Sequence, residues 1–287
     1  MWSRVQKAGD QTATLTGLCC MLDHDLTSDS SQLAMKDTSC LETLVNLLST
    51  DHEECMLGSL KVLSRISALP QIQISISDMG GVQLLVKLLR CQEVGIRALA
   101  ADTLAHVADV RQASKDIRRF GGIPVLMDLL DEHLMAEDDV GPAISVAGAL
   151  RAVGRSAHSR LAMRRGGLIR LLGRAIKTSN TEVLLPLLGI IDQCASECAA
   201  DEKCRRAVLA AGGLDDLAAL LAAEASRADP GLLAAVAAAV WGCVPGCEEA
   251  ARLGSLRVVQ SLVELVQQLA AAELVLQTDG DEQIQKH

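Results

Sequence analysis

A pair of adjacent glycines recurs along the chain at nearly constant intervals. The pairs are Gly80-Gly81, Gly121-Gly122, Gly166-Gly167 and Gly212-Gly213, with spacings of 41, 45 and 46 residues. Each pair precedes a short apolar run with helical spacing, such as VQLLVKLL after the first pair. Self-similarity at a period of roughly 40 residues is the sequence signature of a helical solenoid, in which each unit buries its apolar faces against its neighbours.

Longer amphipathic segments lie between the glycine pairs. Their apolar residues recur at i, i+3, i+4 and i+7, which predicts helices with one buried face. A short polar helix then leads to the next pair, so each unit holds three helices, the first of them short. The glycines fit a tight corner between helices that needs a positive φ or a close backbone approach. The longer segments are 52–67, 93–109, 140–155, 181–196 and 231–244.

These features resemble the armadillo repeat. Its signature is similar to Ser159-Arg160-Leu161-Ala162 followed by GGLIRLL, and to Gly121-Gly122-Ile123-Pro124 followed by VLMDLL. The resemblance implies an all-α, right-handed armadillo-type solenoid of about five repeats with partial terminal repeats. The expected divisions are a partial N-terminal repeat and cap at 1–38, repeats at 39–68 (partial), 69–109, 110–156 (with an acidic insertion, 131–139), 157–197 and 198–246, a partial repeat at 247–276, and a disordered tail at 277–287.

Residues 40–266 also resemble the armadillo-repeat subunit family of the ciliary outer dynein arm docking complex. The similarity includes a proline inside a third helix, Pro186 in VLLPLLGIIDQCASE, and the acidic insertion. It implies docking of outer dynein arms onto axonemal doublet microtubules, with coiled-coil docking subunits, dynein and tubulin as protein partners. It also implies a cytoplasmic protein of the ciliary axoneme.

Composition excludes several other functions. The net charge of −9 argues against nonspecific binding of nucleic acid, and aromatic residues, at 1% of the chain, are too few for base stacking. We expect no membrane association, since no apolar stretch is long enough to span a bilayer. Recurrent catalytic spacings and phosphate-binding loops are absent from the sequence. We therefore expect no enzyme, no cofactor and no small-molecule substrate.

Two cysteine pairs could face two thiolates toward one metal, because Cys194/Cys198 and Cys243/Cys247 have i,i+4 spacing. A structural zinc site needs four ligands, and no histidine lies near either pair. Cys194 and Cys243 also occupy the repeat position of Ile66, Val107 and Val153. Burial as small apolar residues is therefore the favoured interpretation, and no metal site is predicted.

The surface lined by the third helices is the expected site for partners. Peptide-binding armadillo proteins carry a recurring Asn near the end of each third helix, but here that position holds Arg65, His106, Ala152, Gln193 and Gly242. An extended basic peptide would lose its backbone contacts, so the chain is not expected to read nuclear localisation signals.

Residues 140–181 contain basic residues and no acidic ones. With Arg65 and His106, the pair Arg151 and Arg155 could form a basic strip that attracts an acidic coiled coil or a tubulin tail. The favoured interpretation is a solvated face whose cations offset helix dipoles. The candidate partner-binding residues are Arg65, His106, Arg151, Arg155 and Gln193.

The predicted function is a non-enzymatic scaffold for protein–protein interaction in outer dynein arm docking. The alternative is a general cytosolic armadillo adaptor that binds acidic peptides or coiled-coil segments.

Overall fold

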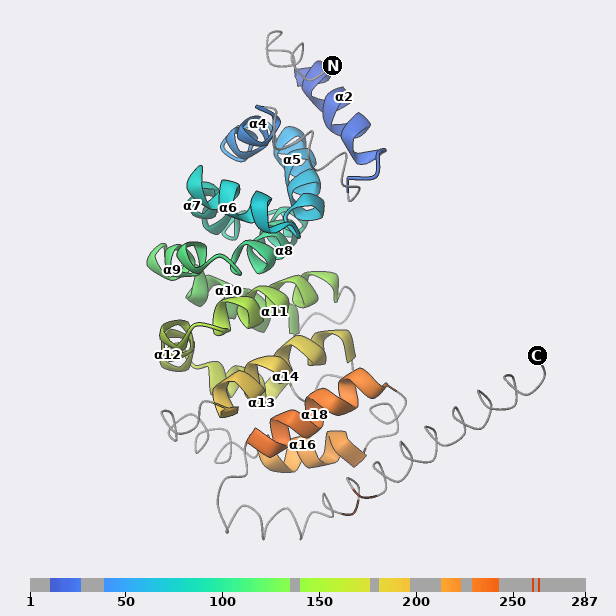
Figure 1. Ribbon diagram of the computed structural model, residues 1–287, viewed down its shortest axis with the longest axis vertical. Coiled ribbons are helices and arrows are strands. Elements are labelled where there is room, and N and C mark those ends of the chain that lie inside the picture. The colour runs from blue at the N-terminus through green and yellow to red at the C-terminus, as the bar shows by residue number, and fades with distance from the viewer. Residues whose placement is uncertain are drawn as a thin grey trace, which may run out of the picture. The chain divides into compact units, whose positions relative to one another are not determined.

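A computed structural model describes residues 11–26, 39–134, 140–175, 181–196, 213–222, 229–242, 260 and 263, and every regular element in these ranges is an α-helix. The predicted all-α class is therefore confirmed (Figure 1). The chain divides into two compact units, Met1–Ile190 and Ile191–His287.

The first unit repeats the predicted order of three helices. The long third helices are α2 (Gln11–Leu22), α5 (Glu53–Ile66), α8 (Val94–Val107), α11 (Gly141–Gly154) and the start of α14 (Thr181–Ser196). The short first helices are α6 (Pro70–Asp78), α9 (Arg111–Arg119) and α12 (Ala157–Arg165). The second helices are α4 (Cys40–Leu47), α7 (Gly81–Leu88), α10 (Gly122–Leu134) and α13 (Leu168–Ala175). The helices predicted from the longer amphipathic segments lie where expected.

Third helices pack side by side in this unit. Helix α5 packs against α2 and α8, and α8 packs against α11, while the first and second helices pack against one another on the other side (Figure 1). The apolar stripes of the third helices meet these helices in a core of aliphatic side chains. Leu63, Leu104 and Leu150 are fully buried in this core. Burial of such stripes is the main stabilising term for a helix that would be marginal in isolation.

The two glycines of a pair serve different purposes. Gly80 and Gly121 have φ of 77° and 73°, a left-handed conformation that costs L-residues energy. Their neighbours are limited by space, because a Cβ on Gly81 would lie 2.8 Å from Ile76 Cγ2 and one on Gly122 would lie 2.9 Å from Ile117 Cγ2. Both reasons given for the predicted corner are thus confirmed.

In the third pair, the positive φ falls on the second glycine instead of the first. Gly167, the second glycine of its pair, takes the positive φ of 96°. Measured from the first residue of α6, α9 and α12, the positive-φ glycines Gly80, Gly121 and Gly167 all stand ten residues later. The distance from the start of the first helix to the positive-φ glycine is therefore constant, although the spacing between the glycine pairs varies.

The acidic insertion begins inside a helix. Helix α10 continues to Leu134, while residues 135–139 lie outside the described ranges. Asp131 forms an ion pair with Arg174, and Glu132 accepts two hydrogen bonds from Arg97, at 3.0 and 3.2 Å. These pairs with neighbouring repeats explain why the acidic sequence continues the helix.

The second unit contains the end of α14 and the packed helices α16 (Gly213–Ala222) and α18 (Pro230–Gly242). Pro186 lies inside α14, as predicted. Trp241, near the end of α18, is 85% exposed. Several predictions fall outside the described residues: Cys198, Cys243 and Cys247, the side chain of Cys194, the C-terminal helix, and both chain ends.

Candidate functional site

The predicted strip lies at the C-terminal ends of the third helices in the first unit, a surface we call the third-helix face. Arg65 is exposed on α5, and its Nη1 donates a 2.8 Å hydrogen bond to the carbonyl oxygen of Leu22 at the end of α2. His106 is half-buried on α8, with its Nδ1 3.0 Å from Ser67 Oγ. Arg65 therefore connects α5 to α2, and His106 connects α8 to the end of α5.

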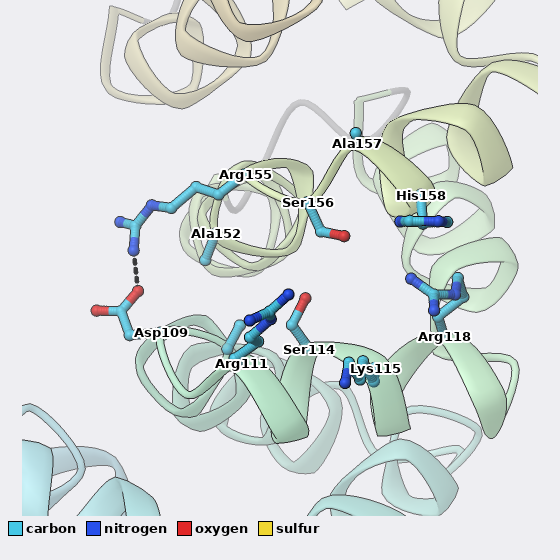
Figure 2. A pocket seen from close by; sticks show the side chains of 11 residues that line it. Asp109, Arg111, Ser114, Lys115, Arg118, Ala152, Arg155, Ser156, Ala157 and His158 are labelled. Carbon is cyan, nitrogen blue, oxygen red and sulfur yellow. Dashed lines mark hydrogen bonds and ion pairs between the residues drawn. The ribbon is translucent and has the colours of Figure 1, made fainter.

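A charged pair makes the next connection. Arg155, which follows α11, forms an ion pair with Asp109, which follows α8 (Figure 2). Ser64 of α5 also donates a hydrogen bond to Asp102 of α8. Successive third helices are thus joined by polar contacts at this face, and its positive charge is partly neutralised.

Arg151 differs from the other members of the strip. It is exposed on α11, and among the described residues it makes no hydrogen bond or ion pair. Its side chain lies across α14, where a Cβ on Gly189 would be 2.7 Å from Arg151 Cδ. Gly189 therefore leaves room for the arginine stem, whose charged group can still reach a partner.

Gln193 belongs to the second unit. Its Oε1 is buried and has no hydrogen-bond partner among the residues described. The structure thus places Arg65, His106, Arg151 and Arg155 on one unit and Gln193 on the other.

Part of the basic stretch 140–181 has a structural role. Arg160 is buried, and its Nη1 donates to the carbonyl oxygens of Gly154 and Arg155, the latter at 2.9 Å. These carbonyls belong to the end of α11, where a cation offsets the negative end of the helix. Arg160 therefore fits the interpretation in which cations of residues 140–181 offset helix dipoles, and not the one in which they bind a partner.

A pocket of about 560 Å³ lies between the ends of α8 and α11 and the helices α9 and α12 (Figure 2). Its basic side chains are Arg111, Lys115, Arg118, Arg155 and His158, its acidic side chain is Asp109, and its hydroxyls are Ser114 and Ser156. The ion pair between Arg155 and Asp109 lies along one edge. The pocket therefore has a strong excess of positive charge.

Of these lining residues, only Arg155 was predicted. Arg111, Ser114, Lys115 and Arg118 stand on one face of α9, at i, i+3, i+4 and i+7, so the periodicity of RQASKDIRR contained the signal. Acidic residues interrupt this part of the sequence, so no uninterrupted run of basic residues marks this face.

Within the described ranges, no helix has the length and apolar character needed to cross a membrane. No cluster of three or more His, Cys, Asp or Glu residues suited to a metal ion occurs in the same part of the chain. The expected burial of Cys194 and Cys243 stays a prediction, because Cys243 and the side chain of Cys194 lie outside the described residues.

Comparison with known proteins gives three curated relatives. The chain is 35% identical to outer dynein arm-docking complex subunit 2 of Bos taurus over 91% of its own length and 29% of the relative. It is 34% identical to the Mus musculus protein of the same name, over 67% of the chain and 19% of the relative. It is 32% identical to the armadillo repeat-containing protein gudu of Drosophila melanogaster, over 91% of the chain and 46% of the relative. The chain therefore spans less than half the length of each relative.

Solved structures agree on the fold, although no protein-family model matches the chain. A designed armadillo repeat protein covers 84% of the chain with a TM-score of 0.73 and 17% identity, and the chain covers 98% of it. An engineered protein covers 91% of the chain with a TM-score of 0.78 and 23% identity, and 62% of that protein is matched. The helix order, the glycine corners and these likenesses agree: the chain has the armadillo-repeat fold and is similar over most of its length to outer dynein arm-docking complex subunit 2.

Proposed function

We propose that the chain is a non-enzymatic scaffold that helps to dock outer dynein arms onto axonemal doublet microtubules. The observation that carries this proposal is the 35% identity, over 91% of the chain, to the bovine docking-complex subunit. Function in a repeat protein lies in its surface rather than in its fold, so the proposal concerns what that surface binds.

The third-helix face supports a docking role. Its polar contacts join α2 to α5, α5 to α8 and α8 to α11, so the surface is preorganised before a partner arrives. A preorganised surface loses less conformational entropy on binding than a mobile one. Adjacent repeats can also supply the roughly 800 Å² per partner that a stable protein interface requires.

The proposed partners are coiled-coil docking subunits, dynein and tubulin, and the proposed location is the ciliary axoneme. Arg151 is the proposed contact residue on the third-helix face, because its charge is not used within the described structure. Arg65, His106 and Arg155 would act mainly by holding the helices in position. Gln193 is proposed as a contact of the second unit, where its buried Oε1 lacks a partner among the described residues.

The experiment is affinity purification of the tagged chain from ciliated cells, with docking subunits quantified by mass spectrometry. Arg151→Glu should reduce recovery of docking subunits severalfold at an unchanged melting temperature, since acidic partners would be repelled. Lys87→Glu is the matched control: it makes the same charge change at an exposed position on the second helix α7.

Equal recovery by both variants would reject the third-helix face as the docking surface. Recovery of unrelated acidic or coiled-coil proteins in place of docking subunits would favour the alternative, a general armadillo adaptor.

A further inference from the structure

The pocket between α9 and α12 carries an inference that does not rest on the proposed docking function. Three of its cations, Arg111, Lys115 and Arg118, make no ion pair with any acidic side chain among the described residues. Asp109, the one acidic side chain that lines the pocket within the described part of the chain, is paired with Arg155. A ligand for this pocket must therefore be an anion, because a cation would meet an excess of like charge.

A buried hydroxyl directs hydrogen bonding into the same space. Ser114 is 7% exposed, and its Oγ has no hydrogen-bond partner among the described residues. Figure 2 shows this hydroxyl beside the Arg111 side chain within the pocket. A buried polar group without a partner costs roughly 1–3 kcal/mol, and a ligand oxygen would remove that cost.

The repeat register explains why the pocket exists. Ser114 is the fourth residue of α9, and the fourth residues of α6 and α12 are Gln73 and Arg160. Gln73 Nε2 donates to the Ala68 carbonyl at 3.4 Å, and Arg160 donates to the carbonyls of Gly154 and Arg155. These long side chains fill the space beside the end of the preceding third helix. The short Ser114 leaves that space open.

Two helix starts add to the preference for an anion. Ser156, the N-cap residue of α12, makes no side-chain capping bond, and its hydroxyl lines the pocket instead. The first amides of a helix have no partner within the helix and attract negative charge. Arg111 is a cation in the first turn of α9, where the helix dipole opposes positive charge. A bound anion would relieve this repulsion.

We propose that this pocket binds a phosphate monoester. A phosphate monoester carries a charge of about −1.5 to −2 and three acceptor oxygens, which matches several cations and two hydroxyls better than one carboxylate does. The volume of about 560 Å³ accommodates the group together with the molecule that carries it. A nucleotide is disfavoured, since none of the described residues that line the pocket is aromatic and could stack on a base. The phosphate can come from a phosphorylated side chain of a partner or from a free polyol phosphate.

The test measures binding of the purified full chain to four probes. These are a fluorescent Gly-Ser peptide with one phosphoserine, its serine form, its glutamate form, and inositol hexakisphosphate as a competitor. The phosphoserine peptide should bind at least about tenfold more tightly than the serine and glutamate forms, and Arg111→Ala should weaken it by about tenfold. Arg119→Ala is the matched control, because Arg119 lies on the same helix, does not line the pocket and pairs with Asp116.

The Ser114→Arg variant tests whether phosphate binding depends on the open space of the pocket or only on the positive charge of the surface. The new arginine would fill the space as Arg160 does one repeat later and donate to the end of α8, so phosphate binding should fall despite the added positive charge. General electrostatic attraction predicts the opposite change.

Tight binding of the peptide alone assigns the phosphate to a partner, and tighter binding of the inositol phosphate with the same sensitivity to the variants assigns it to a free ligand. Equal binding of the glutamate peptide, equal weakening by Arg119→Ala, stronger binding by Ser114→Arg, or no binding of either phosphorylated probe would each overturn the proposal.

Discussion

Arg155, the residue directly after α11, forms an ion pair with Asp109, two residues after the end of α8. Both side chains are about half exposed, at 53% and 44%, so water screens their attraction. The pair joins two third helices and forms an edge of the phosphate pocket (Figure 2). Its importance is therefore in positioning side chains rather than in a large stabilisation.

Reversing one charge of this pair should be destabilising. Arg155→Glu would place two carboxylates together and lower the free energy of unfolding by about 1 kcal/mol, since exposed pairs contribute roughly 0–1 kcal/mol. Adding Asp109→Lys should restore most of the loss, as measured by urea unfolding at low salt. A double variant no more stable than Arg155→Glu alone would contradict the pairing. For this reason Arg151, and not Arg155, is the residue to change in tests of partner binding.

Replacing Arg160 should lower the free energy of unfolding much more than reversing the charge of Arg155. Arg160→Ala would leave the carbonyls of Gly154 and Arg155 without their donor, and we expect a loss of about 2–4 kcal/mol in urea unfolding. Arg165→Ala, an exposed arginine on the same helix, should change the stability by less than about 0.5 kcal/mol. Similar losses in the two variants would show that Arg160 acts only through net charge.

Adjacent glycines should respond differently to the same substitution. Gly80→Ala adds a Cβ in open space and should cost about 1 kcal/mol from its positive φ alone. Gly81→Ala would bring Cβ to 2.8 Å from Ile76 Cγ2 and 2.9 Å from the Ile76 carbonyl oxygen, so the corner must shift. We expect a loss of about 1–3 kcal/mol there.

A substitution to asparagine tests whether the positive φ of Gly80 causes the loss of stability there. Gly80→Asn should be milder than Gly80→Ala, because asparagine tolerates the left-handed conformation better. A thermal or urea series in which Gly81→Ala is neutral would rule out the steric limit at this corner.

Burial controls the reactivity of Cys55. The thiol is 2% exposed, and its pKa is raised above the ordinary value of about 9, first by burial and then by the nearby Glu54 carboxylate. At pH 8, iodoacetamide should therefore modify the exposed Cys19 well before Cys55, as followed by peptide mass spectrometry. Equal rates would show that the α5 core opens readily.

The same shift predicts a pH effect on stability. In the unfolded chain the thiol loses its proton near pH 9, whereas the folded chain retains it to higher pH. Its contribution to stability is thus present below pH 9 and is lost as the pH rises further. The stability advantage of the wild type over Cys55→Ala should narrow above pH 9, and an advantage that grows there would contradict the direction of the shift.

Local sequence was enough to predict the helices, because their apolar periodicity and glycine corners depend on near neighbours. Contacts between repeats were not predictable in this way. Arg155 reaches Asp109 across 46 positions, and Asp131 and Glu132 of α10 pair with Arg174 and Arg97 of neighbouring repeats. The pocket was missed because Ser114 is significant only when α9 is aligned with α6 and α12. At the same position Gln73 and Arg160 are long, and the short serine leaves the open space.

The most direct test of the docking role is the location of the tagged chain in a motile ciliated cell, followed by salt extraction of the isolated axonemes. The account predicts signal along the axoneme that is released together with the outer arm docking subunits. Diffuse signal in the cell body, or axonemal signal that stays behind when the docking subunits are extracted, would contradict it.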